Sequence, residues 1–370
     1  MQVRQVGLRS FRSYERATLD LGQRVTVVTG QNGAGKTNLL EALYFGCTGR
    51  SCRTNNEREL VRFGAETARV TVDVEDDAGS RHELAVGFTP GQPKRITVDG
   101  DPVERLSDHP ARPLVSVFLP ERLDLIKGPP GGRRAHLDQV VAALAPARAG
   151  TRRDFGRALA QRNALLMRIR DGRSSVSALD AWDAEVAGLA ARLAGDRHEV
   201  TGRLAGLLPA AGSDLGLPEE LSVRMRGTAA GATAEDLLAG LAARRDSDVA
   251  RGFTQGGPHR DDLVLEHGGR ELRTYGSQGQ QRAALLALLI GERELIAEAR
   301  GHSPLLLLDD VFSELDAERR ARLVERVTGA GQAVITATEI EHLPEAARGD
   351  ALHIHVESGR LETDGAGAIA

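Results

Sequence analysis

Residues 30–37 (GQNGAGKT) have the composition and spacing of a phosphate-binding loop. In the pattern GxxxxGK[ST], glycines let the backbone turn tightly and point N–H groups at phosphate oxygens. Lys36 would place a compact positive charge on the β- and γ-phosphates, and the Thr37 hydroxyl would ligate Mg²⁺. The apolar segment 24–29 precedes the loop and a helix-like segment 36–45 follows it. This strand–loop–helix context predicts binding of ATP or GTP.

Two adjacent acids, Asp309 and Asp310, follow the apolar run 305–308 (LLLL). A buried strand that ends in carboxylates delivers them to the edge of an open α/β sheet where ligands bind. We expect Asp309 to support the metal ion and Asp310 to orient or deprotonate the attacking water. Taken alone, the segment could also be an ordinary strand followed by a helix cap, but the phosphate loop in the same chain favours the functional interpretation.

A third group of polar residues stands at the start of a long apolar helix-like segment, 282–299. Ser277, Gly279 and Gln280 belong to the run SQGQQR and would form a second anion site at the helix N-terminus. The alternative is a plain capping box, with Ser277 as the cap and Gln280 three residues later.

These motifs need elements that bring distant parts of the chain together. Short apolar and alternating segments predict strands in the first third, and an Ala-, Leu- and Arg-rich stretch at 135–250 predicts helices. Strands are expected again at 263–265, 270–272, 305–308, 333–336, 352–356 and 360–362. We therefore predict one α/β domain built from both chain ends, 1–120 and 251–365, with a helical domain, 121–250, inserted between them.

Composition limits the classes of protein that the chain can belong to. Its 370 residues are 41% hydrophobic and 27% charged, which excludes a disordered chain or a coiled-coil rod. The net charge of −4 excludes a uniformly basic DNA coat. A local patch remains possible at 148–173, which holds eight arginines and two aspartates. The alternative for that segment is a solvated helix face.

The remaining features point to a soluble cytoplasmic protein. Cys47 and Cys52 have neither disulfide-framework nor zinc-site spacing. No apolar run approaches the roughly 20 residues that span a membrane, and the N-terminus does not read as a secretory signal. His259, Asp261 and Asp262 would not share one face of an extended segment, so a metal site there is disfavoured.

The order of the motifs resembles the ABC-type ATPase heads, and several segments resemble the RecF family, which is related to the SMC proteins. The resemblance covers nearly the whole chain and rests on residues 8–14 (LRSFRSY), 30–38, 49–64, 118–138, 257–262 (GPHRDD), SQGQQR and 305–316 (LLLLDDVFSELD). The short middle domain also fits, because it lacks the long heptad pattern of relatives with coiled coils.

This resemblance implies an ATP-dependent homodimer with Mg²⁺ as the metal ion. The implied catalytic residues are Lys36, Asp309 and Asp310, and the implied Mg²⁺ ligands are Thr37 and Asp309. The implied nucleotide-contacting residues are Arg12, Gly30, Gln31, Asn32, Gly33, Ala34, Gly35, Lys36, Thr37 and Asn38, with Ser277, Gly279 and Gln280 acting from the partner subunit. Asp316 would lie in the loop that crosses the dimer interface.

Three departures from the general ABC pattern accompany the resemblance. Asp310 stands where many heads carry a glutamate, which implies slow hydrolysis. The usual metal-sensing glutamine has no counterpart at 117–121. The usual switch histidine is absent from 334–339 (VITATE), where Thr336 or Thr338 could share its role.

The resemblance further implies binding of duplex DNA near gaps and work with RecO and RecR to load RecA on single-stranded DNA. These roles belong to DNA repair, replication and the SOS response. The alternative is an ABC-type ATPase of another system, either a transport subunit or a structural scaffold. A transport subunit would be expected to carry LSGGQ and the switch histidine, and this chain has neither.

Overall fold

The chain folds into two compact units in the computed structural model. The structure describes all residues except 107–108, 121–122, 228, 230, 313–314, 330, 341–343, 345–348, 350 and 364–370. The first unit comprises Met1–Arg122, Asp214–Gly216 and Ile296–Ala370, and the second comprises Leu123–Ser213 and Leu217–Leu295. The second unit thus continues past residue 250, the boundary that we predicted from the sequence for the inserted domain. Residues 364–365 of the expected C-terminal part lie outside the described residues.

Two sheets form the first unit. Sheet A is antiparallel, in the order β2-β1-β4-β5-β6-β7. Its strands are β1 (Gln2–Phe11), β2 (Tyr14–Asp20), β4 (Ala68–Glu75), β5 (Arg81–Phe88), β6 (Arg95–Val98) and β7 (Asp101–Pro102). Buried valines alternate with polar residues along β4, so one face of the sheet packs on the core and the other is polar.

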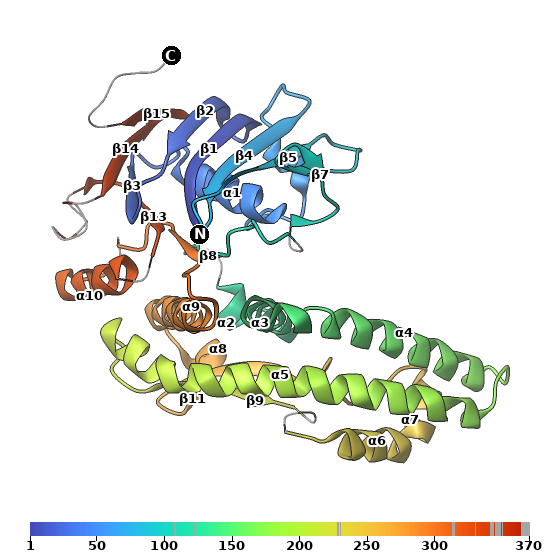
Figure 1. Cartoon of the computed structure of the whole chain (residues 1–370). Helices are drawn as coiled ribbons and strands as arrows, with labels where there is room; N and C mark the ends of the chain where they lie inside the picture. Colours follow the sequence, from blue (N-terminus) through green and yellow to red (C-terminus); the bar gives the residue numbers. More distant parts are fainter. Residues whose placement is uncertain are drawn as a thin grey trace. The chain divides into compact units, whose positions relative to one another are not determined.

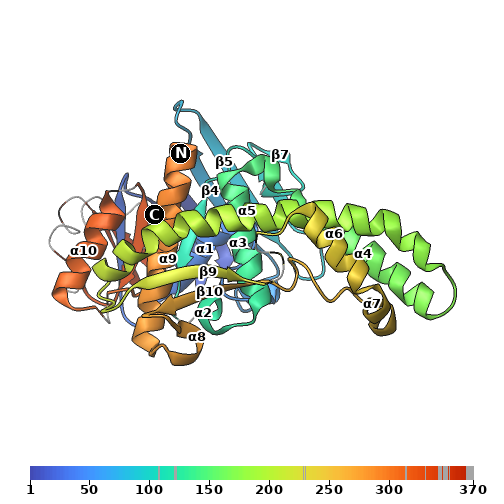
Figure 2. The same cartoon turned by 90° about the horizontal axis from the view of Figure 1, so that it is seen from below.

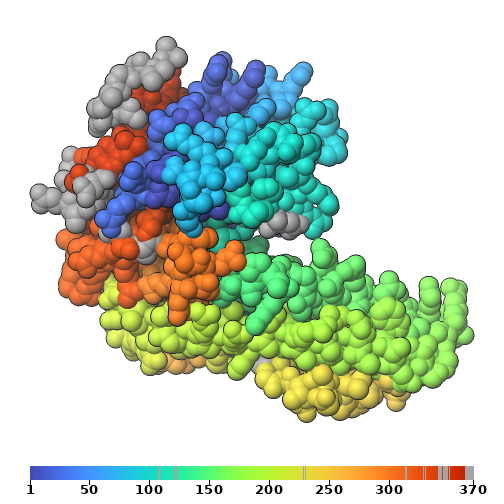
Figure 3. Space-filling view, viewed as in Figure 1, coloured from blue at the N-terminus to red at the C-terminus, as the bar shows by residue number. Residues whose placement is uncertain are grey.

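Sheet B is mostly parallel, in the order β15-β14-β3-β13-β12-β8. Its strands are β3 (Val25–Thr29), β8 (Val115–Phe118), β12 (Leu305–Leu308), β13 (Ala333–Ala337), β14 (Leu352–Glu357) and β15 (Arg360–Thr363). Strands β12 and β13 are buried along their whole length, which explains their apolar runs. The blue and red ends of the chain lie against each other in this unit (Figures 1 and 3). The α/β head built from both chain ends is therefore confirmed.

Helix α1 (Lys36–Thr48) packs against both sheets of the first unit. Leu39, Leu43 and Phe45 of this helix share one buried cluster with valines of sheet A and leucines of sheet B. A Cβ atom at Gly46 would lie 2.4 Å from the Val72 side chain, so the glycine allows α1 to approach β4 closely. The expected helix is confirmed and runs three residues beyond residue 45.

Among the described residues of the first unit, the other helices are the 3-10 helix η1 (Glu57–Leu60), the C-terminal end of α9 and α10 (Ala317–Thr328). The second unit holds α2 (Asp124–Lys127), α3 (Pro130–Leu144), α4 (Thr151–Arg170), α5 (Leu179–Asp214), α6 (Ala234–Ala243), α7 (Arg245–Arg251), α8 (Leu272–Tyr275) and most of α9 (Gln278–Arg300). Across the described part of the chain, no helix has the length and apolar character needed to cross a membrane.

The second unit also contains a small sheet that the sequence did not predict in full. Strand β9 (Leu221–Arg226) lies inside the stretch expected to be helical, and it pairs with β10 (Asp262–His267), which pairs with β11 (Arg270–Glu271). Helix α5 runs alongside β9 (Figures 1 and 2). This pairing ties residues 262–271 to the second unit and explains why the unit continues past residue 250.

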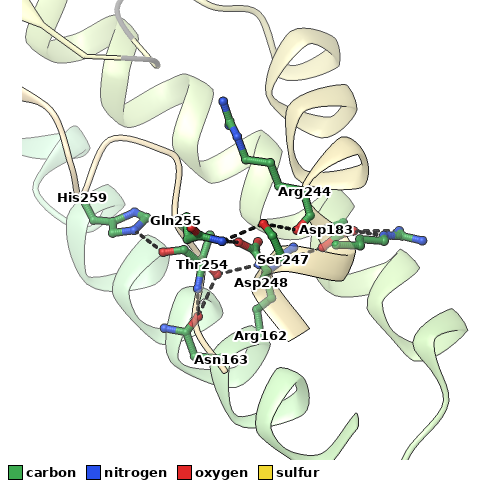
Figure 4. A network of polar contacts seen from close by, with 10 residues as sticks. Arg162, Asn163, Asp183, Arg244, Ser247, Asp248, Thr254, Gln255 and His259 are labelled. Atoms are coloured by element: carbon green, nitrogen blue, oxygen red, sulfur yellow. Dashed lines mark hydrogen bonds and ion pairs between the residues drawn. The ribbon is translucent and has the colours of Figure 1, made fainter. Parts of the chain in front are cut away.

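A buried polar network joins α4, α5 and α7 of the second unit (Figure 4). Arg162 is fully buried and donates to Asp183 (2.7 Å), Asp248 (2.8 Å) and the Thr254 hydroxyl (2.7 Å). Asn163 in turn accepts from the backbone and side chain of Thr254. A buried guanidinium is tolerated only when such partners compensate its lost hydration, so the network fixes how these helices pack.

Candidate functional site

The loop between β3 and α1 has the backbone shape that phosphate binding requires. Gly30, Gly33 and Gly35 have φ values of 149°, 81° and 120°, a region that side chains disfavour. A Cβ atom at Gly30 would lie 2.3 Å from the Val356 carbonyl oxygen, whereas one at Gly33 would meet nothing within 4 Å. Helix α1 begins with no side-chain cap from the described residues, so its first N–H groups can face an anion.

Lys36 lies within this loop. Its Nζ donates to the carbonyl oxygens of Gly30 (2.6 Å) and Gln31 (3.0 Å), and only 7% of the residue is exposed. Burial lowers the pKa of Lys36, while Asp310 and Asp309 oppose that shift by favouring the charged form. The ammonium group is therefore held inside the loop, where a phosphate would compete with the two carbonyl oxygens for it.

Asp309 joins three elements of the first unit at the end of β12. Its Oδ2 accepts from the Thr37 hydroxyl (2.7 Å), and its Oδ1 accepts from the Thr336 hydroxyl (2.7 Å). Its backbone N–H donates to the Phe118 carbonyl oxygen (3.0 Å) of β8. The hydroxyl and the carboxylate expected to ligate Mg²⁺ are thus in direct contact.

Thr336 of β13 is a site residue whose contact the sequence did not reveal. It is fully buried, and its Oγ1 also accepts from the backbone N–H of Asp310 (2.9 Å). Asp310 has a positive φ of 44°, which is rare for a residue with a side chain. The one available signal was a threonine in the apolar run of β13, at the position where ABC heads carry the switch loop.

Arg12 and Asn38 are engaged with protein side chains close to the loop. Arg12 makes a bidentate pair with the fully buried Glu41 of α1, at 2.8 and 3.0 Å. Asn38 donates to the Ser13 hydroxyl and accepts from Arg53, which also contacts Glu41. Sequence reasoning missed Glu41, because a lone glutamate in a helix gives no sign that it will be buried.

The SQGQ segment forms a reciprocal capping box at the start of α9. The Ser277 N–H donates to Gln280 Oε1 (2.8 Å), and the Gln280 N–H donates to the Ser277 hydroxyl (3.3 Å). Ser277 and Gly279 are exposed, so the cap does not prevent contact with another molecule. This segment belongs to the second unit, whereas the phosphate loop belongs to the first.

The acidic segment after Asp310 is described only in part. Ser313 and Glu314 lie outside the described residues, as does Glu121 at the end of 117–121. Asp316 is the N-cap of α10 and accepts from the Arg319 N–H at 2.9 Å. His259 and Asp262, disfavoured as metal ligands, contact the Thr254 carbonyl oxygen and Arg133 respectively.

The arginine-rich segment 148–173 does not form one free basic face. Arg162 is buried in the polar network, Arg152 lies 3.3 Å from Asp138, and Arg157 pairs with Asp154. Arg148 contacts Asp196 and Glu199 of α5. Acidic neighbours therefore offset part of the positive charge that the sequence suggested here.

A phosphate loop after β3, with a carboxylate at the end of β12 in the same parallel sheet, defines a P-loop ATPase head of the ABC type. Residues 2–358 match the family described as RecF/RecN/SMC N terminal domain. The chain belongs to this family and, within it, to the RecF proteins.

Relatives and solved structures agree over nearly the whole chain. The chain is 40% identical to a DNA replication and repair protein RecF of Anaeromyxobacter sp. (strain K), covering 97% of this chain and 98% of that protein. It is 38% identical to the RecF of Kineococcus radiotolerans, with the same coverage. A structure of the recombination mediator protein RecF with ATP, in the RecFOR pathway, is 27% identical with a TM-score of 0.85, covering 98% and 97% of the two chains.

Proposed function

We propose that this protein is an ATP-dependent DNA-binding switch of DNA replication and recombinational repair in the cytoplasm. The observation that carries the proposal is the contact of Asp309 with both Thr37 and Thr336 beside the phosphate loop. The relatives named as DNA replication and repair proteins, and the ATP-bound recombination mediator, support the same assignment.

The residues present fit ATP and Mg²⁺. The positive φ values of the loop glycines and the uncapped start of α1 suit a polyphosphate. The Thr37 hydroxyl and the Asp309 carboxylate are the oxygen donors that Mg²⁺ prefers. When bound, Mg²⁺ would neutralise charge on the phosphates during their hydrolysis. Lys36 would hold the terminal phosphates, and Asp310 would orient the attacking water.

ATP would act mainly as the contact between two copies of the chain. Ser277, Gly279 and Gln280 would reach the nucleotide held by the partner subunit, using the N-terminus of α9 as a second anion site. Because ATP would bind the closed dimer more tightly than the separate subunits, its hydrolysis would release the closed state. Slow hydrolysis suits a switch of this kind.

DNA, RecO and RecR are the partners that we propose, with RecA loading on single-stranded DNA as the outcome. The ATP-bound relative is a recombination mediator protein in the RecFOR pathway, which supports this choice. The aromatic content of 3% favours backbone contacts by arginine over base stacking, so binding should weaken strongly with salt. A role in the SOS response would follow from RecA loading.

The test is to measure the size of the protein by sedimentation, with and without ATP and duplex DNA. We expect ATP to convert the wild type from monomer to dimer, and Ser277→Arg to block this conversion while ATP binding is retained. Ser177→Arg is the matched control, because Ser177 is also an exposed serine of the second unit. An ATP-dependent dimer of normal strength in Ser277→Arg would refute the role in trans.

A further inference from the structure

The polar face of sheet A carries a row of arginines that are aligned across its strands. Arg9 of β1 is directly opposite Arg16 of β2 on one side and Arg69 of β4 on the other. Arg69 is opposite Gly87 of β5, and Gly87 is opposite Arg95 of β6. One line across five neighbouring strands therefore holds four arginines and one glycine, which we call the arginine row.

The four side chains project from the same face, because residues directly opposite each other in a sheet point the same way. The neighbours Leu8, Val70 and Ile96 point to the core side of the sheet, and the arginines therefore point away from it. All four are exposed. None of them makes an ion pair or a side-chain hydrogen bond with any residue that the structure describes.

The opposite end of the same face is acidic. Gln5 of β1 is opposite Asp20 and Asp73, and Asp73 is opposite Glu83. Burial raises the pKa of Asp73, and the neighbouring Asp20 acts in the same direction while Arg81 opposes it. A row of small residues that includes Gly7 and Thr71 separates the two ends. The face is therefore strongly polarised along its strands.

Like charges placed directly opposite each other destabilise a sheet. Sheet A nevertheless sets Arg16, Arg9 and Arg69 side by side, and Arg95 follows one strand beyond Gly87, without acids between them. A polyanion that lies across the strands would relieve this repulsion, and guanidinium groups match phosphate oxygens in geometry and charge. We propose that the arginine row binds the phosphate backbone of duplex DNA. This inference rests on the proposed DNA binding and assigns it to a surface.

The dimensions agree with that ligand. Four strand spacings of about 4.8 Å give the row a length of about 19 Å. Duplex DNA carries one charge per about 1.7 Å of its axis, so this length faces roughly 11 phosphates of the two strands. A Cβ atom at Gly87 would lie 3.8 Å from the Arg95 Cβ, an ordinary contact. Gly87 thus leaves an open place within the row. The acidic end would repel the DNA and confine it to the basic end.

The first experiment compares two variants with the same number of lost charges. The row variant is R9Q/R16Q/R69Q/R95Q. The control is R81Q/R105Q/R322Q/R360Q, which changes four arginines of the same unit outside the row, of which Arg322 is partly buried and the other three are exposed. DNA affinity is measured with a short fluorescent duplex at a series of salt concentrations, in the presence of ATP. Retained ATP binding verifies that each variant is folded.

Each lost phosphate contact reduces the slope of log affinity against log salt by about 0.9. The salt slope of the row variant should therefore be smaller than that of the wild type by about 3.6. Between roughly 50 and 200 mM salt, the affinity of the row variant should then fall about 100-fold less than the affinity of the wild type. The control should keep the wild-type slope and affinity. Equal slopes for the row variant and the wild type would overturn the inference while the proposed DNA binding stood. A wild type that binds no DNA would overturn both.

A single substitution provides a second test that does not depend on four changes. Gly87→Asp places a carboxylate in the middle of the row, and Gly87→Asn adds a side chain of the same shape without charge. Gly87→Asp should weaken DNA binding about tenfold relative to Gly87→Asn at low salt. Equal affinities of these two variants would count against the arginine row.

Discussion

Thr336 offers the most specific test of the site, because one hydroxyl connects both acids at the end of β12. Thr336→Val keeps the shape of the side chain and removes the hydroxyl. Asp309 Oδ1 then loses its 2.7 Å donor, and the Asp310 N–H loses its 2.9 Å acceptor. We expect the Asp309 carboxylate to rotate away from the position in which it contacts Thr37.

The magnitude follows from the two contacts and from their burial. A hydrogen bond to a charged group contributes about 1.5–3 kcal/mol, and a buried N–H group left without an acceptor costs about 1–3 kcal/mol. The bond of the Asp310 N–H is only part-buried, so its loss falls at the low end of that range. Since Thr336 is fully buried, water cannot readily replace the hydroxyl. Together these losses give about 3 kcal/mol of local stability, which corresponds to roughly a 100-fold change in an opening equilibrium.

The assay is hydrogen–deuterium exchange of the peptide that contains β12 and Asp310, together with the rate of ATP hydrolysis. Thr336→Val should exchange faster in this peptide and hydrolyse ATP more slowly than the wild type. Thr336→Ser is the control, because it keeps the hydroxyl and loses one buried methyl group, worth about 1 kcal/mol. If Thr336→Val and Thr336→Ser behaved alike in both measurements, the reasoning about the hydroxyl would be refuted.

Two further predictions concern Lys36 and His259. Lys36→Arg should abolish turnover, because the forked guanidinium overfills a loop that holds the ammonium group between two carbonyl oxygens; DNA-stimulated turnover at the wild-type rate would contradict this. Burial lowers the pKa of His259, with Arg260 and Arg134 acting in the same direction, while the hydrogen bond to the Thr254 carbonyl oxygen and the charge of Asp248 oppose the shift. His259 should therefore make the second unit less stable as the pH falls below about 6.5, the ordinary histidine pKa, because the unfolded chain then binds the proton more readily. His259→Gln should lose less of its free energy of unfolding than the wild type between about pH 7.5 and 5.5. The measurement is urea unfolding monitored by the fluorescence of Trp182. A pH dependence equal to that of the wild type would contradict this role of His259.

Much of the phosphate-binding half of the site could be predicted from local sequence. The spacing of Gly30, Gly35 and Lys36 determines a loop whose shape depends on a few neighbouring residues. The run 305–308 likewise predicted a buried strand that ends at Asp309, because an uninterrupted apolar run fits a strand covered on both faces. Both features arise within short segments, where propensity and periodicity carry most of the information.

The contacts between distant segments could not be obtained in this way. Strand β9 lacks a long apolar run and forms because β10 pairs with it, which extends the second unit past residue 250. From the sequence, Arg162 appeared to belong to a surface patch, but the structure buries it in a network with Asp183 and Asp248. Each case depends on partners that are far apart in the chain.

The sequence by itself determined the nucleotide loop, the acidic strand end and the family resemblance, because each depends on residue types at fixed local spacing. Only the tertiary structure decided that Thr336 joins Asp309 to the Asp310 N–H, and that Arg9, Arg16 and Arg69 stand in one row. The register of the strands decides which side chains share a face, because a shift of one residue would turn every side chain of a strand to the opposite face.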